Sequence, residues 1–116
     1  MKPFLPLLIS IFFSSFLSAY TVSMVNNTNS DMKVMVNYFA TDMCSPDTLI
    51  IPSYNRMKKK VGLCCTRPDV LVLGLNNELK GLSFSYNPPR TGFWLSCRSW
   101  TAVINQSDHN FVVETR

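Results

Sequence analysis

The chain contains four cysteines, and their spacing is the most informative chemical feature of the sequence. Cys64 and Cys65 are adjacent, whereas Cys44 and Cys97 stand alone on either side of them. Neighbouring residues in an extended chain point to opposite faces, so a bridge within the adjacent pair would be strained. We therefore expect Cys44 to pair with one member of the adjacent pair and Cys97 with the other. The spacing leaves both connectivities open.

Zinc is the other chemistry that four cysteines support. Structural zinc sites usually bring their ligands as cysteine pairs roughly two to four residues apart, and the sequence has no such pair. An even number of cysteines in a small exported chain is typical of a disulfide framework. We therefore expect two disulfides, no metal ion and no cofactor.

The only histidine, His109, follows Ser107 and Asp108, which together are the residue types of a catalytic triad. A triad needs a base held beside its nucleophile, and three polar neighbours in one turn do not provide that geometry. Motifs of nucleotide-binding loops, zinc proteases and serine hydrolases are absent from the sequence. We therefore expect a solvated turn at His109 and no enzyme activity.

The only run of like charges is formed by Arg56, Lys58, Lys59 and Lys60, which are candidate binding residues. Such a run can bind phosphate, a heparin-like polymer or anionic lipid. Lysines are also common on the edge strands of sheets, where they discourage association with other strands. We favour this second interpretation.

The segment 87–94 (NPPRTGFW) has the composition of a recognition loop. Two consecutive prolines restrict its backbone and exclude it from the centre of a sheet. Arg90, Phe93 and Trp94 match residue types that are enriched at binding hot spots, and they are candidate binding residues. In the alternative, the loop only connects two strands, Phe93 packs inward, and Trp94 faces outward unless a second layer covers it.

An apolar leader precedes these residues. Lys2 is followed by an apolar stretch over residues 4–17, and small residues follow it up to Ala19. This order is typical of a secretory signal peptide, and the stretch is shorter than the roughly 20 residues of a membrane-spanning helix. We expect a signal peptide at 1–19, cleavage after Ala19, and one secreted or periplasmic domain at 20–116.

Loss of Lys2 with the leader lowers the formal net charge from +4 to +3. This charge is too weak to indicate nucleic acid as a partner. A protein, a glycan or an anionic surface is the expected partner, and no later segment is long enough to span a membrane. A core of this size is marginal, so the disulfides are expected to matter for folding.

Residues 20–116 show the two-residue apolar alternation of β-strands and no window of helical spacing. We expect an all-β fold: a small disulfide-stapled β-sandwich, or a small barrel, of seven to eight short antiparallel strands. The first two strands, 20–26 and 32–39, are expected to form a hairpin, and a further strand is expected at 93–98. Residues 70–75 are apolar on both faces, which predicts a central strand covered on both sides.

The sequence therefore favours an exported, non-enzymatic binding module whose loops carry the contact surface. The alternative is a membrane-active β-protein that binds anionic lipid through the basic run and exposed aromatic residues. Two segments, at Asn26 and at Asn105, fit the acceptor pattern for N-linked glycans, which matters only in a host that glycosylates exported proteins.

Overall fold

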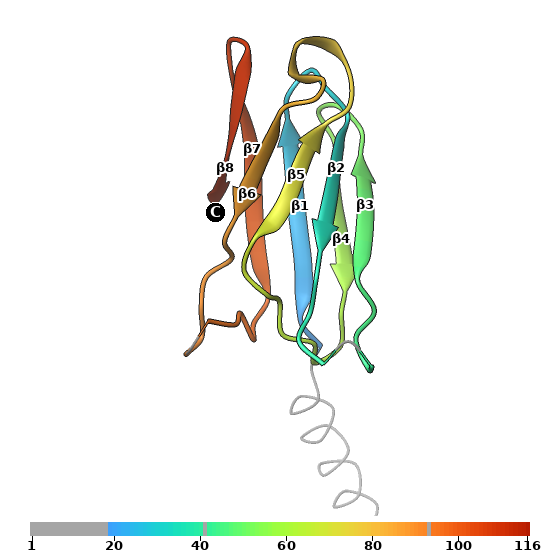
Figure 1. Ribbon diagram of the computed structural model, residues 1–116, viewed down its shortest axis with the longest axis vertical. Helices are drawn as coiled ribbons and strands as arrows, with labels where there is room; N and C mark the ends of the chain where they lie inside the picture. Colours follow the sequence, from blue (N-terminus) through green and yellow to red (C-terminus); the bar gives the residue numbers. More distant parts are fainter. Residues whose placement is uncertain (1–18, 41, 93) are drawn as a thin grey trace, which may run out of the picture.

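The computed structural model describes residues 19–40, 42–92 and 94–116, so most of the expected signal peptide (1–19) and Phe93 lie outside the described residues. Two four-stranded sheets pack face to face (Figure 1), which confirms the expected all-β sandwich. The strands are β1 (Thr21–Asn27), β2 (Met32–Val36), β3 (Asp47–Ile51), β4 (Arg56–Lys60), β5 (Val70–Gly74), β6 (Ser83–Tyr86), β7 (Trp100–Ser107) and β8 (Asn110–Thr115). Between β5 and β6 lies one 3-10 turn, η1 (Asn77–Leu79). Within the described ranges, no helix is long and apolar enough to cross a membrane.

Sheet A has the strand order β4-β1-β7-β8, and sheet B has the order β3-β2-β5-β6. All neighbours are antiparallel except β1 and β7, which are parallel. The sequence prediction of antiparallel strands alone is therefore wrong for this one pair. Both strands start from the same end of the sandwich and meet at the centre of sheet A. A parallel pair requires a long crossover connection. Here the chain between the end of β1 and the start of β7, which includes all of sheet B, provides it.

The expected hairpin between the first two strands does not form, because β1 belongs to sheet A and β2 to sheet B. The turn between them crosses from sheet to sheet around the buried side chain of Asn26. Its amide donates to the backbone carbonyls of Ser30, Ile51 and Pro52 at 2.8, 3.0 and 3.2 Å. Its Oδ1 accepts from the backbone N–H and the hydroxyl of Thr28 at 3.1 and 2.6 Å. A polar turn that suggests a hairpin is here a connection between two layers.

The core lies between the sheets and is built mainly from alternate residues of the strands, as the alternation predicts, although the edge strand β4 contributes no buried residue. The buried apolar residues are Val22, Met24, Met32, Val34, Val36, Tyr38, Ile51, Val70, Val72, Leu79, Tyr86, Trp100, Ala102, Ile104, Phe111 and Val113. Strand β5 is central in sheet B, but Leu71 on its outer face is 36% exposed. The prediction that this strand is covered on both sides is therefore wrong, because no second layer packs against the outer face of sheet B among the described residues.

Candidate binding surface at the disulfide end

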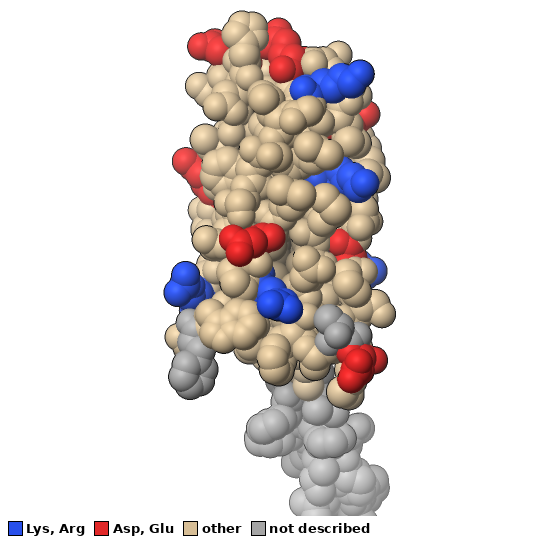
Figure 2. Space-filling model, in the orientation of Figure 1, with Lys and Arg blue, Asp and Glu red and all other residues tan. Residues whose placement is uncertain are grey.

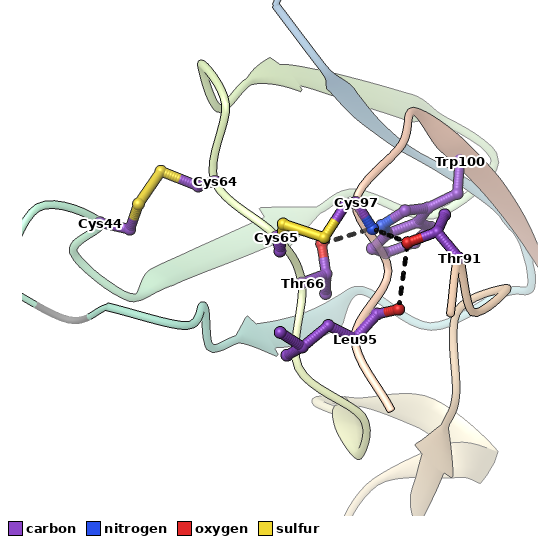
Figure 3. The surroundings of a disulfide bond; sticks show 8 residues. All are labelled: Cys44, Cys64, Cys65, Thr66, Thr91, Leu95, Cys97 and Trp100. Carbon is purple, nitrogen blue, oxygen red and sulfur yellow. Dashed lines mark hydrogen bonds between the residues drawn. A yellow bond between two sulfur atoms is a disulfide. The ribbon is translucent and has the colours of Figure 1, made fainter. Parts of the chain in front are cut away.

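Three loops meet at one end of the sandwich, which we call the disulfide end. They span residues 37–46, 61–69 and 87–99. Cys44 pairs with Cys64 and Cys65 pairs with Cys97, so the adjacent cysteines of the middle loop tie it to both neighbours (Figure 3). This confirms the separate pairing and fixes its connectivity. The adjacent cysteines lie in a loop, because β4 ends at Lys60. Two disulfides fit an oxidising environment, such as the extracellular space or the periplasm.

Main-chain hydrogen bonds reinforce this cross-linking. The N–H of Phe39 donates to the carbonyl of Cys65 at 3.0 Å. Thr66 and Ser96 exchange two backbone hydrogen bonds of 2.8 and 2.9 Å, which joins the middle loop to the loop of residues 87–99. The hydroxyl of Thr66 also accepts a hydrogen bond of 3.0 Å from Nε1 of the buried Trp100 (Figure 3). The three loops therefore form one cross-linked unit on the end of the core.

The strand expected at 93–98 is not found among its described residues, where Ser96 makes only an isolated bridge. The loop is instead held by its own contacts: the N–H of Thr91 donates to the carbonyl of Leu95 at 3.0 Å. The Thr91 hydroxyl accepts from the N–H of Cys97 at 3.0 Å (Figure 3).

Trp94 is 43% exposed, which settles the question that the sequence left open. The guanidinium carbon of Arg67 lies 5.3 Å from the centroid of its ring, within the range of cation–π attraction. The ring of Phe39 meets it edge-on at a centroid distance of 6.3 Å. Arg90, the other described candidate in this loop, is exposed. Trp94 is thus held by one residue from each of the other two loops, with part of its face free.

An apolar groove of about 530 Å³ lies beside this aromatic group. Its walls include Phe39, Met43 and Leu63, which are 54%, 87% and 62% exposed. With Trp94, they are four of the eight large apolar side chains that are exposed in the described chain. Apolar side chains gathered at one end of a domain are a common mark of an interaction site.

The basic run forms β4, an edge strand of sheet A, as the favoured interpretation predicted. Its members have different surroundings. Lys59 pairs with Asp47 on the neighbouring edge of sheet B, with 2.7 Å between Nζ and Oδ1. Arg56, Lys58 and Lys60 are exposed. Lys59 therefore ties the two sheet edges together, whereas the other three cations make no described salt bridge.

His109 lies in the turn between β7 and β8, at the end of the sandwich opposite the disulfides, and its side chain is 85% exposed. Its Nδ1 is 3.4 Å from a carboxylate oxygen of Glu78 in η1. The structure places it in the solvated turn that the sequence predicted. Across the described ranges, no three His, Cys, Asp or Glu side chains are grouped so that they could hold a metal ion.

Sequence reasoning missed Phe39, Met43, Leu63 and Arg67 as members of this surface. Two of these residues stand next to a cysteine in the chain, since Met43 precedes Cys44 and Leu63 precedes Cys64. A large apolar residue directly before a cysteine is the signal that the sequence offers for these two positions. The position of Arg67 beside Trp94 depends on the fold alone.

No protein family model, no curated protein and no solved structure matches this chain.

Proposed function

We propose that this protein is an exported binding module, not an enzyme, and that it contacts its partner through the disulfide end. The observation that carries the proposal is the half-exposed Trp94 held between Arg67 and Phe39. Trp and Arg are the residue types that most often dominate binding energy. The indole offers a large apolar face with few rotatable bonds to freeze when a partner binds.

Preorganisation supports the same conclusion. The disulfides Cys44–Cys64 and Cys65–Cys97 restrict the three loops before any partner arrives. Binding therefore loses less conformational entropy than it would with free loops. The groove beside Trp94 is apolar, so an apolar segment of a partner protein is the ligand that it fits best. Arg90, exposed in the same loop as Trp94, is suited to a carboxylate on that partner.

Photo-crosslinking from the surface of the groove tests this proposal. Met43, which is 87% exposed, is replaced with benzoylphenylalanine, and the protein is incubated with intact cells that export it. We expect a discrete crosslinked product that excess wild-type protein competes away and that excess Trp94→Ala or Arg90→Ala competes poorly. The same probe at Val112, which is 40% exposed on β8, is the matched control.

Two results would contradict the proposal. The first is the same set of products from both probe positions. The second is full competition by a Trp94→Ala protein whose thermal midpoint equals that of the wild type, because the exposed indole would then contribute nothing to binding. If only Arg90→Ala competes fully, Arg90 is not part of the binding surface, and the rest of the proposal stands.

A membrane-active protein is the second candidate, favoured by the same cluster of exposed apolar residues beside Arg67. Such side chains enter the interface of a bilayer while a cation remains at the headgroups. Trp94 is a built-in reporter, because the only other tryptophan, Trp100, is 4% exposed. Vesicles containing phosphatidylserine should shift its emission to the blue, and salt should weaken the effect. An unchanged spectrum argues for the protein partner.

A further inference from the structure

The outer face of sheet A carries a row of cationic and hydroxyl side chains in register. Ser23 of β1 pairs with Lys58 of β4 on one side and with Thr101 of β7 on the other. The N–H of Arg116, the residue that follows β8, donates to the carbonyl of Thr101 at 2.9 Å, which places Arg116 next in the row. Residues paired in this way share one face, and it is the face opposite the buried Met24 and Ala102. The row Lys58–Ser23–Thr101–Arg116 therefore crosses the full width of the sheet.

Three more cations surround this row. Arg56 and Lys60 are two residues away from Lys58 on β4, so they lie on the same face at a spacing of about 7 Å. Arg98 lines a hollow together with Arg116. The only carboxylate on this face among the described strand residues is Glu114, which pairs with Val103. Among the described strand residues, three cations (Arg56, Lys58 and Lys60) share this face with one carboxylate, and Arg98 and Arg116 lie beside it.

None of the five cations is neutralised by a partner within the described residues, where the salt bridges are Lys59 with Asp47 and His109 with Glu78. Sheet B differs in this respect. Figure 2, which views the molecule from the side of sheet B, shows acidic and basic side chains interspersed over that face. The positive charge is thus concentrated on the outer face of sheet A.

Two hollows of about 210 and 250 Å³ lie along this face and share Ser23, Thr101 and Arg116. Ser23 is 8% exposed, so it forms part of the floor, while Lys58 and Arg56 line the first hollow. Hydroxyl groups between cations are suited to hydrogen-bond the oxygens of an anion.

We propose that the outer face of sheet A binds a linear sulfated polysaccharide. The cations are spread over a width of about 14 Å, three strand spacings, so they cannot converge on a single phosphate. The outward residues of β1, β4 and β7 include no aromatic side chain on which a nucleic-acid base would stack. The exposed apolar cluster that would enter a membrane lies at the disulfide end. The choice of an extracellular polysaccharide as the ligand rests on the proposed export of the protein. The charged face itself does not depend on the proposed function.

Heparin is the probe for this proposal. The affinity of the wild-type protein is measured at several NaCl concentrations. We expect binding that persists at about 0.15 M salt and weakens linearly on a log–log plot. In the double variant Lys58→Gln/Arg116→Gln, the magnitude of the slope should fall by about two, because two ionic contacts are lost. Affinity at the lowest salt concentration should fall at least about tenfold.

The matched control is Lys33→Gln/Lys80→Gln, which removes the same net charge from other parts of the surface. It should keep the wild-type slope. An equal loss of slope in both double variants would show a response to net charge alone and would overturn the proposal. So would preferential loss of binding to phosphatidylserine vesicles, with heparin binding unchanged, in Lys58→Gln/Arg116→Gln. The charge-retaining variant Lys58→Arg/Arg116→Lys should bind heparin like the wild type, and its failure would also count against the proposal.

Discussion

Nε1 of Trp100 donates a hydrogen bond of 3.0 Å to the hydroxyl of Thr66, and both side chains are buried. This bond joins the first residue of β7 to the middle loop of the disulfide end, next to the bridge between Cys65 and Cys97 (Figure 3). The indole also packs against Tyr86 of sheet B, with 5.6 Å between ring centroids. Trp100 is therefore the point where the core meets the cross-linked loops.

Substitutions at Trp100 and at Trp94 should show that the first stabilises the fold and that the second does not. Trp100→Phe removes the donor and leaves the buried Thr66 hydroxyl without it, at a cost of about 1–3 kcal/mol in the free energy of unfolding. Trp94→Phe, at the exposed position, should change stability by less than about 0.5 kcal/mol. Urea unfolding followed by circular dichroism measures both. Equal losses in the two variants would show that Trp94 is also a core residue.

The disulfides should differ slightly in their contribution to stability. They span 20 and 32 residues, so the chain-entropy model gives about 3.3 kcal/mol for Cys44–Cys64 and about 3.7 kcal/mol for Cys65–Cys97. Paired Cys→Ser variants remove each bridge without leaving a free thiol, and their thermal midpoints give the two losses. Partial reduction with alkylation should recover these two pairings. A bridge between Cys44 and Cys65 would contradict the structure.

The β-sandwich could be predicted because it depends on local patterns. Val22 and Met24 alternate with Thr21 and Ser23, and Pro52 and the polar residues after Asn27 mark the ends of strands. The assignment of strands to sheets could not be predicted in the same way. The amide of Asn26 reaches carbonyls 25 and 26 residues away, and these contacts decide that the turn crosses between sheets. Contacts between residues so far apart in the chain cannot be read from a local sequence pattern.

The candidate surface was predictable to the same limited extent. Arg90 and Trp94 stand in a proline-restricted loop of unusual composition, which the sequence displays directly. Phe39, Leu63 and Arg67 come from other loops, and they reach Trp94 or its groove only because the disulfides and the pairing of Thr66 with Ser96 bring three distant loops together. Positions of this kind follow from topology.

Asn26 should be one of the residues least tolerant of substitution. Asn26→Asp replaces an amide that donates to three carbonyls with a carboxylate that can only accept, in a buried position. We expect a loss of about 3–5 kcal/mol in the free energy of unfolding, or failure to fold. Asn27→Asp is the matched control, because Asn27 is exposed, and it should be nearly neutral. Comparable losses of stability in both variants would show that the added charge, and not the loss of the buried amide, destabilises the protein.

Stability should also fall at alkaline pH, because two buried tyrosines hold their protons in the folded state. Burial raises the pKa of Tyr38 above its ordinary value of 10.0, and its 2.6 Å hydrogen bond to Asp47 and the charge of that carboxylate add to the rise. Burial also raises the pKa of Tyr86, against the effect of its hydrogen bond with Thr115. In the unfolded chain both groups lose their protons near pH 10.

The unfolded state therefore binds fewer protons than the folded state above that pH. The stability contribution of these groups is complete below about pH 10 and decreases above it, for Tyr38 by about 1.4 kcal/mol per pH unit over the range in which only the folded state keeps the proton. Urea unfolding at pH values from about 8 to 11 measures this slope. Tyr38→Phe lowers stability at neutral pH, because the bond to Asp47 is lost, but it should make the alkaline slope shallower. A variant that keeps the full wild-type slope would show that Tyr38 ionises in the folded protein as easily as in the unfolded chain.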